Sequence, residues 1–307
     1  MATPVLIDTD MGIDDAIAIA LALSTPQLEL AGLASVGGNV PLEQATCNVA
    51  RLLAALQLKN PPPVGQGLDQ RNGLRGAEHV FGSDGLGECG LAVPPDYHPI
   101  GFIELYEQCI ARHGSSLAVV AIGPLTNLAA LLRERPGLLQ SVGRIIIMGG
   151  AIWCPGNINP AAEFNFYRDP KATAEVLSAG LPVTLVPLDV TRQVALDESH
   201  VAHLSRSEHN GGELLARMVR WALARKVDGG SKFIIHDAVA VGALLWPELF
   251  LRSRIGLEIV TRGDQAGRSR PIVLKDKSKQ VGVVLSVNVG DFLENLLGLI
   301  CQEEFIV

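Results

Sequence analysis

Cysteine, aromatic residues and long apolar stretches are scarce in this chain of 307 residues. Its five cysteines are scattered and form no CxxC pair, which argues against a disulfide framework or a cysteine-based zinc site. No apolar run reaches the roughly 20 residues that a membrane helix needs. The first residues also lack the basic and apolar regions of a secretory signal. We therefore expect a cytoplasmic protein with reduced thiols and no membrane span.

Clustered positive charge is also lacking. The 25 Lys and Arg residues are outnumbered by 32 Asp and Glu residues, which gives a formal net charge of −7 at pH 7. Basic residues gather only in 262–279, where acidic residues interrupt them. A nucleic-acid-binding surface needs clustered Lys and Arg, so none is predicted.

Apolar runs of strand length alternate with helical patterns along most of the chain. This predicts a Rossmann-like α/β fold, with a mostly parallel central sheet flanked by helices. Short strands joined by polar turns within 255–287 predict a small antiparallel appendage. No linker or repeat divides the chain, so we expect one domain over 1–307. The predicted strands are Val5–Ile7, Leu28–Val36, Leu117–Ile122, Arg144–Met148, Val183–Val186, Leu257–Thr261, Pro271–Leu274 and Val281–Ser286.

The predicted helices are Asp14–Leu23, Leu42–Leu58, Leu125–Leu132, Pro170–Ser178, Glu213–Arg225, Asp237–Leu245 and Val289–Ile300. The segment 65–100 is rich in glycine and has little periodicity, so it is predicted to be a long loop. Long irregular loops in compact enzymes often carry function.

The most specific feature is the acidic segment Asp8-Thr9-Asp10-Met11-Gly12-Ile13-Asp14-Asp15, between the first predicted strand and helix. The carboxyl ends of strands in α/β sheets are where ligands bind. Four carboxylates in eight residues repel one another unless a cation holds them together. Carboxylate oxygens select Ca²⁺ or Mg²⁺ over zinc. Asp14 and Asp15 point roughly 100° apart on a helix, so one would bind the metal and the other a substrate hydroxyl.

Three other interpretations of the segment fit it less well. Helix capping accounts for the last two aspartates but not for the first two. An EF-hand loop would need Gly and Glu where Ile13 and Ile19 stand. A phosphatase of the haloacid dehalogenase type would carry Thr or Val in place of Gly12. A metal site is therefore preferred.

The acidic segment resembles the DTDxGxDDAxA signature of the inosine-uridine preferring nucleoside hydrolases. Further blocks of that family follow in the same order, between residue 5 and about residue 245. They are Gly37-Gly38-Asn39, Gly123-Pro124-Leu125-Thr126-Asn127, Met148-Gly149-Gly150, Gly156-Asn157 with Ala162-Glu163-Phe164-Asn165, and His236-Asp237. The resemblance implies the nucleoside hydrolase fold and hydrolysis of the N-glycosidic bond of ribonucleosides to ribose and free base. It also implies a homodimer or homotetramer.

The resemblance further implies roles for individual residues. Ca²⁺ would be held by three carboxylates and one backbone carbonyl, those of Asp10, Asp15, Asp237 and Thr126. Asp10 would be the general base that activates a water bound to the ion, and His236 would protonate the leaving base. The substrate would be contacted by a larger set, which is Asp14, Asn39, Met148, Asn157, Glu163, Phe164, Asn165 and His236.

The chemistry of the reaction fits these residue types. Cleavage of an N-glycosidic bond passes through an oxocarbenium-like ribosyl cation, which carboxylate and amide oxygens stabilise. The attacking water must lose a proton, and a carboxylate beside a weakly polarising Ca²⁺ can accept it. Glu163 and Asn165 are two residues apart and would face the same way on an extended segment.

Two places depart from the family pattern and leave the preferred base open. Phe81 stands where the family has a histidine, and it would either stack on the base or pack in the core. The predicted helix Glu213–Arg225 carries Trp221 and no tyrosine. Trp221 would either stack on a base or lie in the core. The substrate could therefore be an N-riboside other than an ordinary ribonucleoside.

Two other function classes stay open from the sequence. The chain could be a non-catalytic protein that binds ribose or nucleosides through a retained metal site, although the intact Asp10 argues against this. It could also be a metal-dependent phosphatase, which would release orthophosphate from nucleotides.

Overall fold

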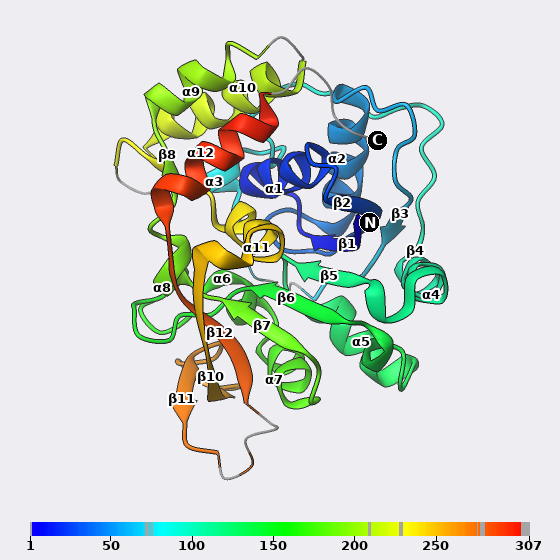
Figure 1. Ribbon diagram of the computed structural model, residues 1–307, viewed down its shortest axis with the longest axis vertical. Coiled ribbons are helices and arrows are strands. Elements are labelled where there is room, and N and C mark those ends of the chain that lie inside the picture. The colour runs from blue at the N-terminus through cyan, green and yellow to red at the C-terminus, as the bar shows by residue number, and fades with distance from the viewer. Residues whose placement is uncertain are drawn as a thin grey trace.

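The computed structural model describes residues 2–70, 74, 76–207, 210–226, 230–274, 276 and 280–301. Its centre is a sheet with the strand order β11-β10-β12-β7-β6-β5-β1-β2-β3-β4 (Figure 1). Neighbouring strands from β12 to β4 run parallel, and β10 and β11 pair antiparallel at one edge. The strands are β1 (Thr3–Thr9), β2 (Leu28–Ser35), β3 (Val64–Gln66), β4 (Ile100–Gly101), β5 (Ala118–Ala121), β6 (Arg144–Met148), β7 (Val183–Val186), β10 (Phe250–Ile259), β11 (Ser269–Ile272) and β12 (Val281–Val287).

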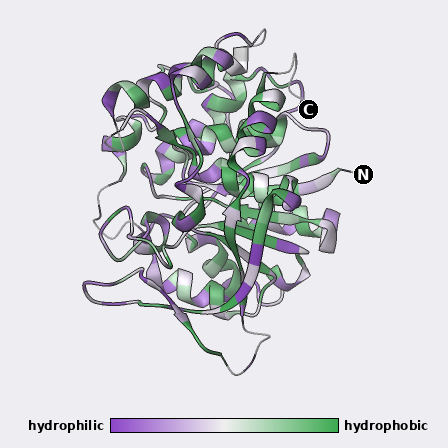
Figure 2. Ribbon diagram, turned by 60° about the vertical axis from the view of Figure 1, so that its left-hand side comes forward, coloured by the Kyte–Doolittle hydropathy of each residue, from purple (hydrophilic) through white to green (hydrophobic). Residues whose placement is uncertain are grey.

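The helices form a layer on each face of this sheet (Figure 1). Alternation along β1 explains why both faces are covered, because Val5 and Ile7 belong to one apolar core and Leu6 to the other. One layer contains α1 (Ile13–Leu23), α2 (Leu42–Ala55), α9 (Glu198–Leu204), α10 (Asn210–Arg225), α11 (His236–Leu245) and α12 (Val289–Ile300). The other contains α4 (Phe102–His113), α5 (Thr126–Glu134) and α7 (Pro170–Ser178). Figure 2 shows the hydrophobic residues concentrated in the strands and the hydrophilic residues on the outer parts of the helices.

The shorter elements lie mainly in the connections. They are α3 (Glu78–Phe81), α6 (Phe164–Arg168), α8 (Leu188–Thr191), the 3₁₀ turns η1 (Gly114–Ser116), η2 (Leu139–Ser141) and η3 (Pro247–Leu249), and a second sheet of β8 (Ala195–Leu196) and β9 (Phe233–Ile234). The described residues of the predicted loop 65–100 are mostly irregular, with α3 among them. Among the described residues, no helix is both long and apolar enough to cross a membrane.

The predicted mostly parallel sheet with helices and an antiparallel edge is confirmed, with differences at that edge. The predicted appendage is partly continuous with the main sheet, because β12 pairs parallel with β7. Its first strand, β10, begins at Phe250 rather than at Leu257. The helix α4 was not predicted. It begins shortly after the segment 65–100, which was predicted to be a loop.

Strand β1 lies at the centre of the sheet, between β2 and β5. The chain runs outward from β1 through β2 and β3 to β4, and then returns to the other side of β1 as β5. Such a reversal of strand order leaves a crevice at the carboxyl ends of the strands, where ligands bind in open α/β sheets. The acidic segment begins at this crevice.

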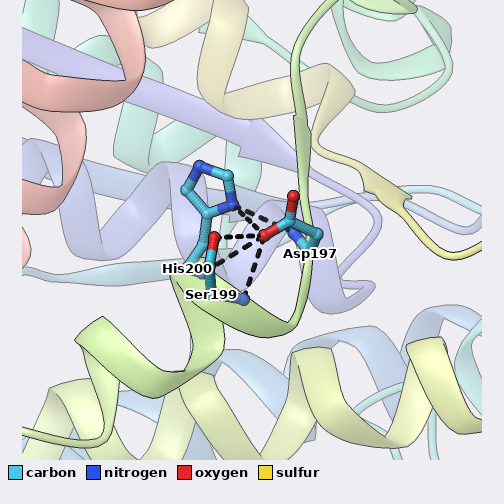
Figure 3. A network of polar contacts seen from close by, with 3 residues as sticks. All are labelled: Asp197, Ser199 and His200. Atoms are coloured by element: carbon cyan, nitrogen blue, oxygen red, sulfur yellow. Dashed lines mark hydrogen bonds and ion pairs between the residues drawn. The ribbon is translucent and has the colours of Figure 1, made fainter.

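Asp197 caps the N-terminus of α9 (Figure 3). Its Oδ1 atom accepts hydrogen bonds from the Ser199 hydroxyl at 2.6 Å and the Ser199 amide at 3.0 Å, and it lies 2.7 Å from Nδ1 of His200. Asp, His and Ser are also the residue types of a hydrolase triad. Here, however, the Ser199 hydroxyl donates to Asp197 rather than to the imidazole, so the group is a helix cap and not a nucleophile with its base.

Candidate active site

A cavity of about 150 Å³ opens at the carboxyl ends of the central strands. Every site residue predicted from the sequence lines it except Asp15 and Thr126. Those that line it are Asp10, Asp14, Asn39, Met148, Asn157, Glu163, Phe164, Asn165, His236 and Asp237. Segments far apart in the sequence are therefore brought together at one place.

Three buried aspartates lie at the starts of two helices that pack against each other, α1 and α11. Asp14 and Asp15 are in the first turn of α1, and Asp237 is in the first turn of α11. Each offers one carboxylate oxygen, and these oxygens lie within 4.8 Å of one another. Helix N-termini favour negative charge, and closely spaced carboxylate oxygens are the ligand set of a hard cation such as Ca²⁺ or Mg²⁺. The residues therefore fit a metal ion.

Asp10 lies on the loop between β1 and α1 and is held by Asn39, which follows β2. The backbone amide of Asn39 donates to Oδ2 of Asp10 at 2.8 Å, and its side-chain amide donates to Oδ1 at 3.0 Å. Gly38 is needed for this close approach, because a Cβ atom there would lie 2.0 Å from Oδ2 of Asp10. The next residue, Met11, has a φ of 54°, a left-handed conformation that non-glycine residues rarely adopt.

Asp15 is fixed by donors from the same loop. Its carboxylate accepts hydrogen bonds from the Thr9 hydroxyl and, at 2.7 Å, from the Gly12 amide. The side-chain amide of Asn39 also donates to it at 3.3 Å. Asn39 thus connects Asp10 and Asp15, and the loop geometry around both carboxylates is determined by the ends of β1 and β2.

Burial makes these carboxylates difficult to ionise. It is the main cause that raises the pKa of Asp10, Asp15 and Asp237 above the usual range. The charges of the neighbouring aspartates raise the pKa of Asp10 and Asp237 further. A bound cation would reverse both effects, since it favours the ionised form of every carboxylate near it.

The acidic group differs from the predicted metal-ligand set. The three closest carboxylates are those of Asp14, Asp15 and Asp237, whereas the sequence predicted Asp10 in place of Asp14. Thr126 is buried at the first residue of α5 and does not line the cavity. Its hydroxyl donates to Asp169 at 2.9 Å, so the side chain is used to link α5 to the start of α7.

The segment that carries Glu163 and Asn165 is not extended as predicted, because α6 begins at Phe164. Glu163 caps this helix, and its buried carboxylate accepts from the amides of Asn165, Phe166 and Gly150 at 2.7, 3.1 and 3.0 Å. The side-chain amide of Asn165 donates to the carbonyl of Ile122 at 2.9 Å. Both residues still line the cavity, since the cap turns the chain there.

His236 is oriented by Thr191. Its Nδ1 atom lies 2.7 Å from the Thr191 hydroxyl, at the end of α8. Burial, together with the charge of Arg192, lowers the pKa of His236 to about 3. The imidazole is therefore neutral near pH 7, and one ring nitrogen is already engaged by the hydroxyl.

Apolar side chains form another part of the wall. Phe81 lines the cavity and meets Phe233 edge-on, with ring centroids 6.5 Å apart. It is 8% exposed, so it both packs in the core and faces the cavity. Trp221 does not line the cavity. It packs against Gly82 and Gly87, which agrees with a packing role rather than with stacking on a base.

Several lining residues were not predicted from the sequence. They are Ala77, His79, Val80, Ile122, Ile158, Arg192, Phe233 and Ile234. Phe233 and Ile234 directly precede the His236 block, so their apolar character was a usable signal. Arg192 follows the short helix α8 and had no motif to mark it.

Fold and site together define a class: a parallel α/β protein with a buried acidic cluster, able to hold a metal ion, at the switch point of its sheet. The chain belongs to the inosine-uridine preferring nucleoside hydrolase family, whose sequence model matches residues 5–294. It is accordingly an N-glycosyl hydrolase that acts on ribonucleosides.

Relatives named for different specificities are similar to this chain. Uridine nucleosidase 1 of Arabidopsis thaliana is 34% identical over 86% of this chain and 80% of its own length. A pyrimidine-specific ribonucleoside hydrolase of Salmonella enteritidis is 35% identical over 86% of each chain. Among solved structures, a purine-preferring ribonucleoside hydrolase from Gardnerella vaginalis has a TM-score of 0.91 and 28% identity, covering 99% of this chain and 100% of its own. A plant nucleoside hydrolase has a TM-score of 0.92 and 29% identity, covering 98% and 100%.

Proposed function

We propose that this protein hydrolyses ribonucleosides to ribose and free base with Ca²⁺ bound in its acidic cluster and Asp10 as the general base. The observation that carries the proposal is the convergence of four buried carboxylates, three of them on the wall of a cavity beside amide side chains. Such oxygen-rich ligands suit Ca²⁺. The ribose hydroxyls and the ribosyl cation are the groups that carboxylate and amide oxygens would recognise.

The metal would be held by Asp15 and Asp237, which belong to both the predicted ligand set and the closest carboxylate group. The Thr126 carbonyl and Asp10 would complete the set. When bound, Ca²⁺ lowers the pKa of a water molecule and anchors sugar hydroxyls by charge. The ion would also balance the repulsion among the aspartates.

Asp10 would take the proton of the attacking water. It lines the cavity, and two hydrogen bonds from Asn39 fix its carboxylate in one orientation. A fixed carboxylate within reach of the reacting water is what general base catalysis requires. Asp14, in the first turn of α1, would bind the ribose diol together with Asn39.

The wall formed by the 148–165 segment would bind the rest of the sugar. Glu163 and Asn165 are held by backbone contacts, so their atoms that face the cavity are preorganised. Met148, Asn157 and Phe164 would contribute the remaining contacts. His236 would donate a hydrogen bond to the leaving base through the ring nitrogen that Thr191 does not use.

A panel of ribonucleosides, including inosine, uridine, cytidine and adenosine with nicotinamide riboside as a further N-riboside, tests the reaction in the presence of Ca²⁺. We expect ribose release from at least one compound, and a loss of kcat on the order of 10²–10⁴-fold in Asp10→Asn. Asp14→Asn is the matched comparison and should mainly raise KM, because its role is binding. Tight ribonucleoside binding in calorimetry without turnover would instead support a non-catalytic binding protein.

We further propose that the protein is a homodimer or homotetramer of cytoplasmic location. Light scattering of the purified protein measures the oligomeric state, and a monomer at micromolar concentration would contradict it.

A further inference from the structure

Arg192 has a position that the proposed mechanism does not use. It follows α8, which begins after the carboxyl end of β7, and it lines the cavity. Its guanidinium donates to the carbonyls of Pro155 and Gly156 at 2.7 and 2.8 Å. Two hydrogen bonds from one planar group hold it in a fixed orientation, so its charge is preorganised.

This charge and the acidic cluster belong to different elements, since Arg192 follows α8 and the cluster lies at the starts of α1 and α11. Among the described residues that line the cavity, Arg192 is the one lysine or arginine. It directly follows Thr191, whose hydroxyl lies 2.7 Å from Nδ1 of His236. The cavity therefore has negative charge around the sugar-binding aspartates and a positive charge beside His236.

Cleavage of the N-glycosidic bond develops a positive and a negative charge, and the two kinds of charge on the cavity wall would stabilise them. When the C1′–N bond breaks, its electron pair leaves with the base, so the ribosyl group becomes positive and the base becomes negative. Carboxylates would stabilise the first charge. His236 has one ring nitrogen left for the base, because the other is engaged by Thr191. A single neutral hydrogen bond stabilises an anion less than a charged donor does.

We propose that Arg192 is a catalytic residue on the leaving-group side, where its guanidinium stabilises the negative charge of the departing base. The inference rests on the proposed function. In the balanced reaction, water oxygen bonds to C1′ and gives one proton to Asp10, which returns it to solvent. The base leaves with the C1′–N electron pair and takes one proton from solvent, while the neutral His236 donates a hydrogen bond to it. Arg192 gives up no proton and lowers the energy of the anionic base before that proton arrives.

The test measures kcat for a series of ribonucleosides whose bases differ in acidity, with 4-nitrophenyl riboside as the substrate with the most stable leaving anion. In Arg192→Gln we expect kcat to fall on the order of 10²-fold for the poorest leaving bases. The loss should shrink steadily as the base becomes more acidic. Arg192→Lys, which keeps the charge, should recover most of the rate.

Asp189→Asn is the matched control for the position of the nearby loop. Asp189 accepts from the amides of Ile152 and Trp153 at 2.9 and 2.8 Å, so its loss loosens the same loop without removing the positive charge. It should affect all substrates by the same factor. If Arg192→Gln also lowers all rates equally, or lowers none, Arg192 has no leaving-group role. If the wild-type protein cleaves none of the substrates, the proposed function itself has failed.

Discussion

Aspartates lie in two contrasting environments in this molecule. In the acidic cluster, Asp10, Asp15 and Asp237 are buried, and burial raises the pKa of each. At the start of α9, Asp197 lies near the surface, and hydrogen bonds from Ser199 lead the causes that lower its pKa to about 2 (Figure 3). The ionised form of an aspartate is therefore destabilised in the acidic cluster and stabilised at the start of α9.

The difference separates functional from structural aspartates. Ionised carboxylates buried together cost free energy, and a protein keeps such a group where it binds something that offsets the cost. The cap of α9 needs no ligand, because the helix amides already satisfy its carboxylate. Asp15, Asp237 and Asp197 all lie at helix N-termini, so position on a helix alone does not distinguish the two groups.

Removal of the metal should give the largest effect on stability. Chelation with EDTA should lower the Tm, and added Ca²⁺ should restore it, because the ion binds the folded state alone. At a free concentration about 1,000-fold above Kd, the gain is about 4 kcal/mol in the free energy of unfolding. Differential scanning calorimetry over a range of Ca²⁺ concentrations measures this shift.

The Asp197→Ala variant is the control for that measurement. It should show the same shift with Ca²⁺ as the wild-type protein, because α9 lies outside the acidic cluster. Asp15→Asn should lose most of the shift. A Tm that is equal with EDTA and with Ca²⁺ in the wild-type protein would contradict a metal site in the cluster.

Much of the fold and of the candidate site was predictable, because both follow from local signals. The alternation of apolar runs predicted the central strands, with β6 and β7 found at the predicted bounds. The acidic segment predicted the cluster, since its aspartates come directly after a buried strand. The extended conformation predicted for the segment with Glu163 and Asn165 was wrong, because the sequence did not show that Glu163 would cap a helix.

Other features depend on contacts between distant segments. Arg192 enters the cavity because the segment that follows β7 lies beside it, which no local pattern indicates. The pairing of β12 with β7 was missed for the same reason. The closest carboxylate group contains Asp14, where the sequence predicted Asp10. This difference depends on how α11 packs against α1.

The next largest effect on stability is expected for Tyr106, which contacts Asp8 at the start of the acidic segment. The buried hydroxyl of Tyr106 donates to Asp8 at 3.0 Å, and Asn127 donates to the same oxygen at 2.9 Å. Tyr106→Phe removes one of these donors from a buried carboxyl group, so we expect a loss of about 1–3 kcal/mol in the free energy of unfolding. Urea denaturation measures the change.

Tyr97→Phe is the matched control. The Tyr97 hydroxyl donates to the Thr46 carbonyl at 3.2 Å in a half-buried place, and loss of this bond should cost less than about 1 kcal/mol. Equal losses in the two variants would mean that the hydrogen bond from Tyr106 to the buried Asp8 carboxyl group contributes no more than an ordinary hydrogen bond.

The smallest effect on stability should come from loss of Asp197, which caps α9 near the surface. Asp197→Ala should lower the free energy of unfolding by about 1 kcal/mol at neutral pH, since it removes a helix cap.

The folded pKa of Asp197, about 2, is below its ordinary value of 3.8, so its charge stabilises the fold above about pH 4. That contribution is lost as the pH falls toward 2. Asp197→Asn keeps the cap without the charge, so its difference from wild type should disappear near pH 2. A difference that stays constant from pH 7 to pH 2 would show that the charge contributes nothing.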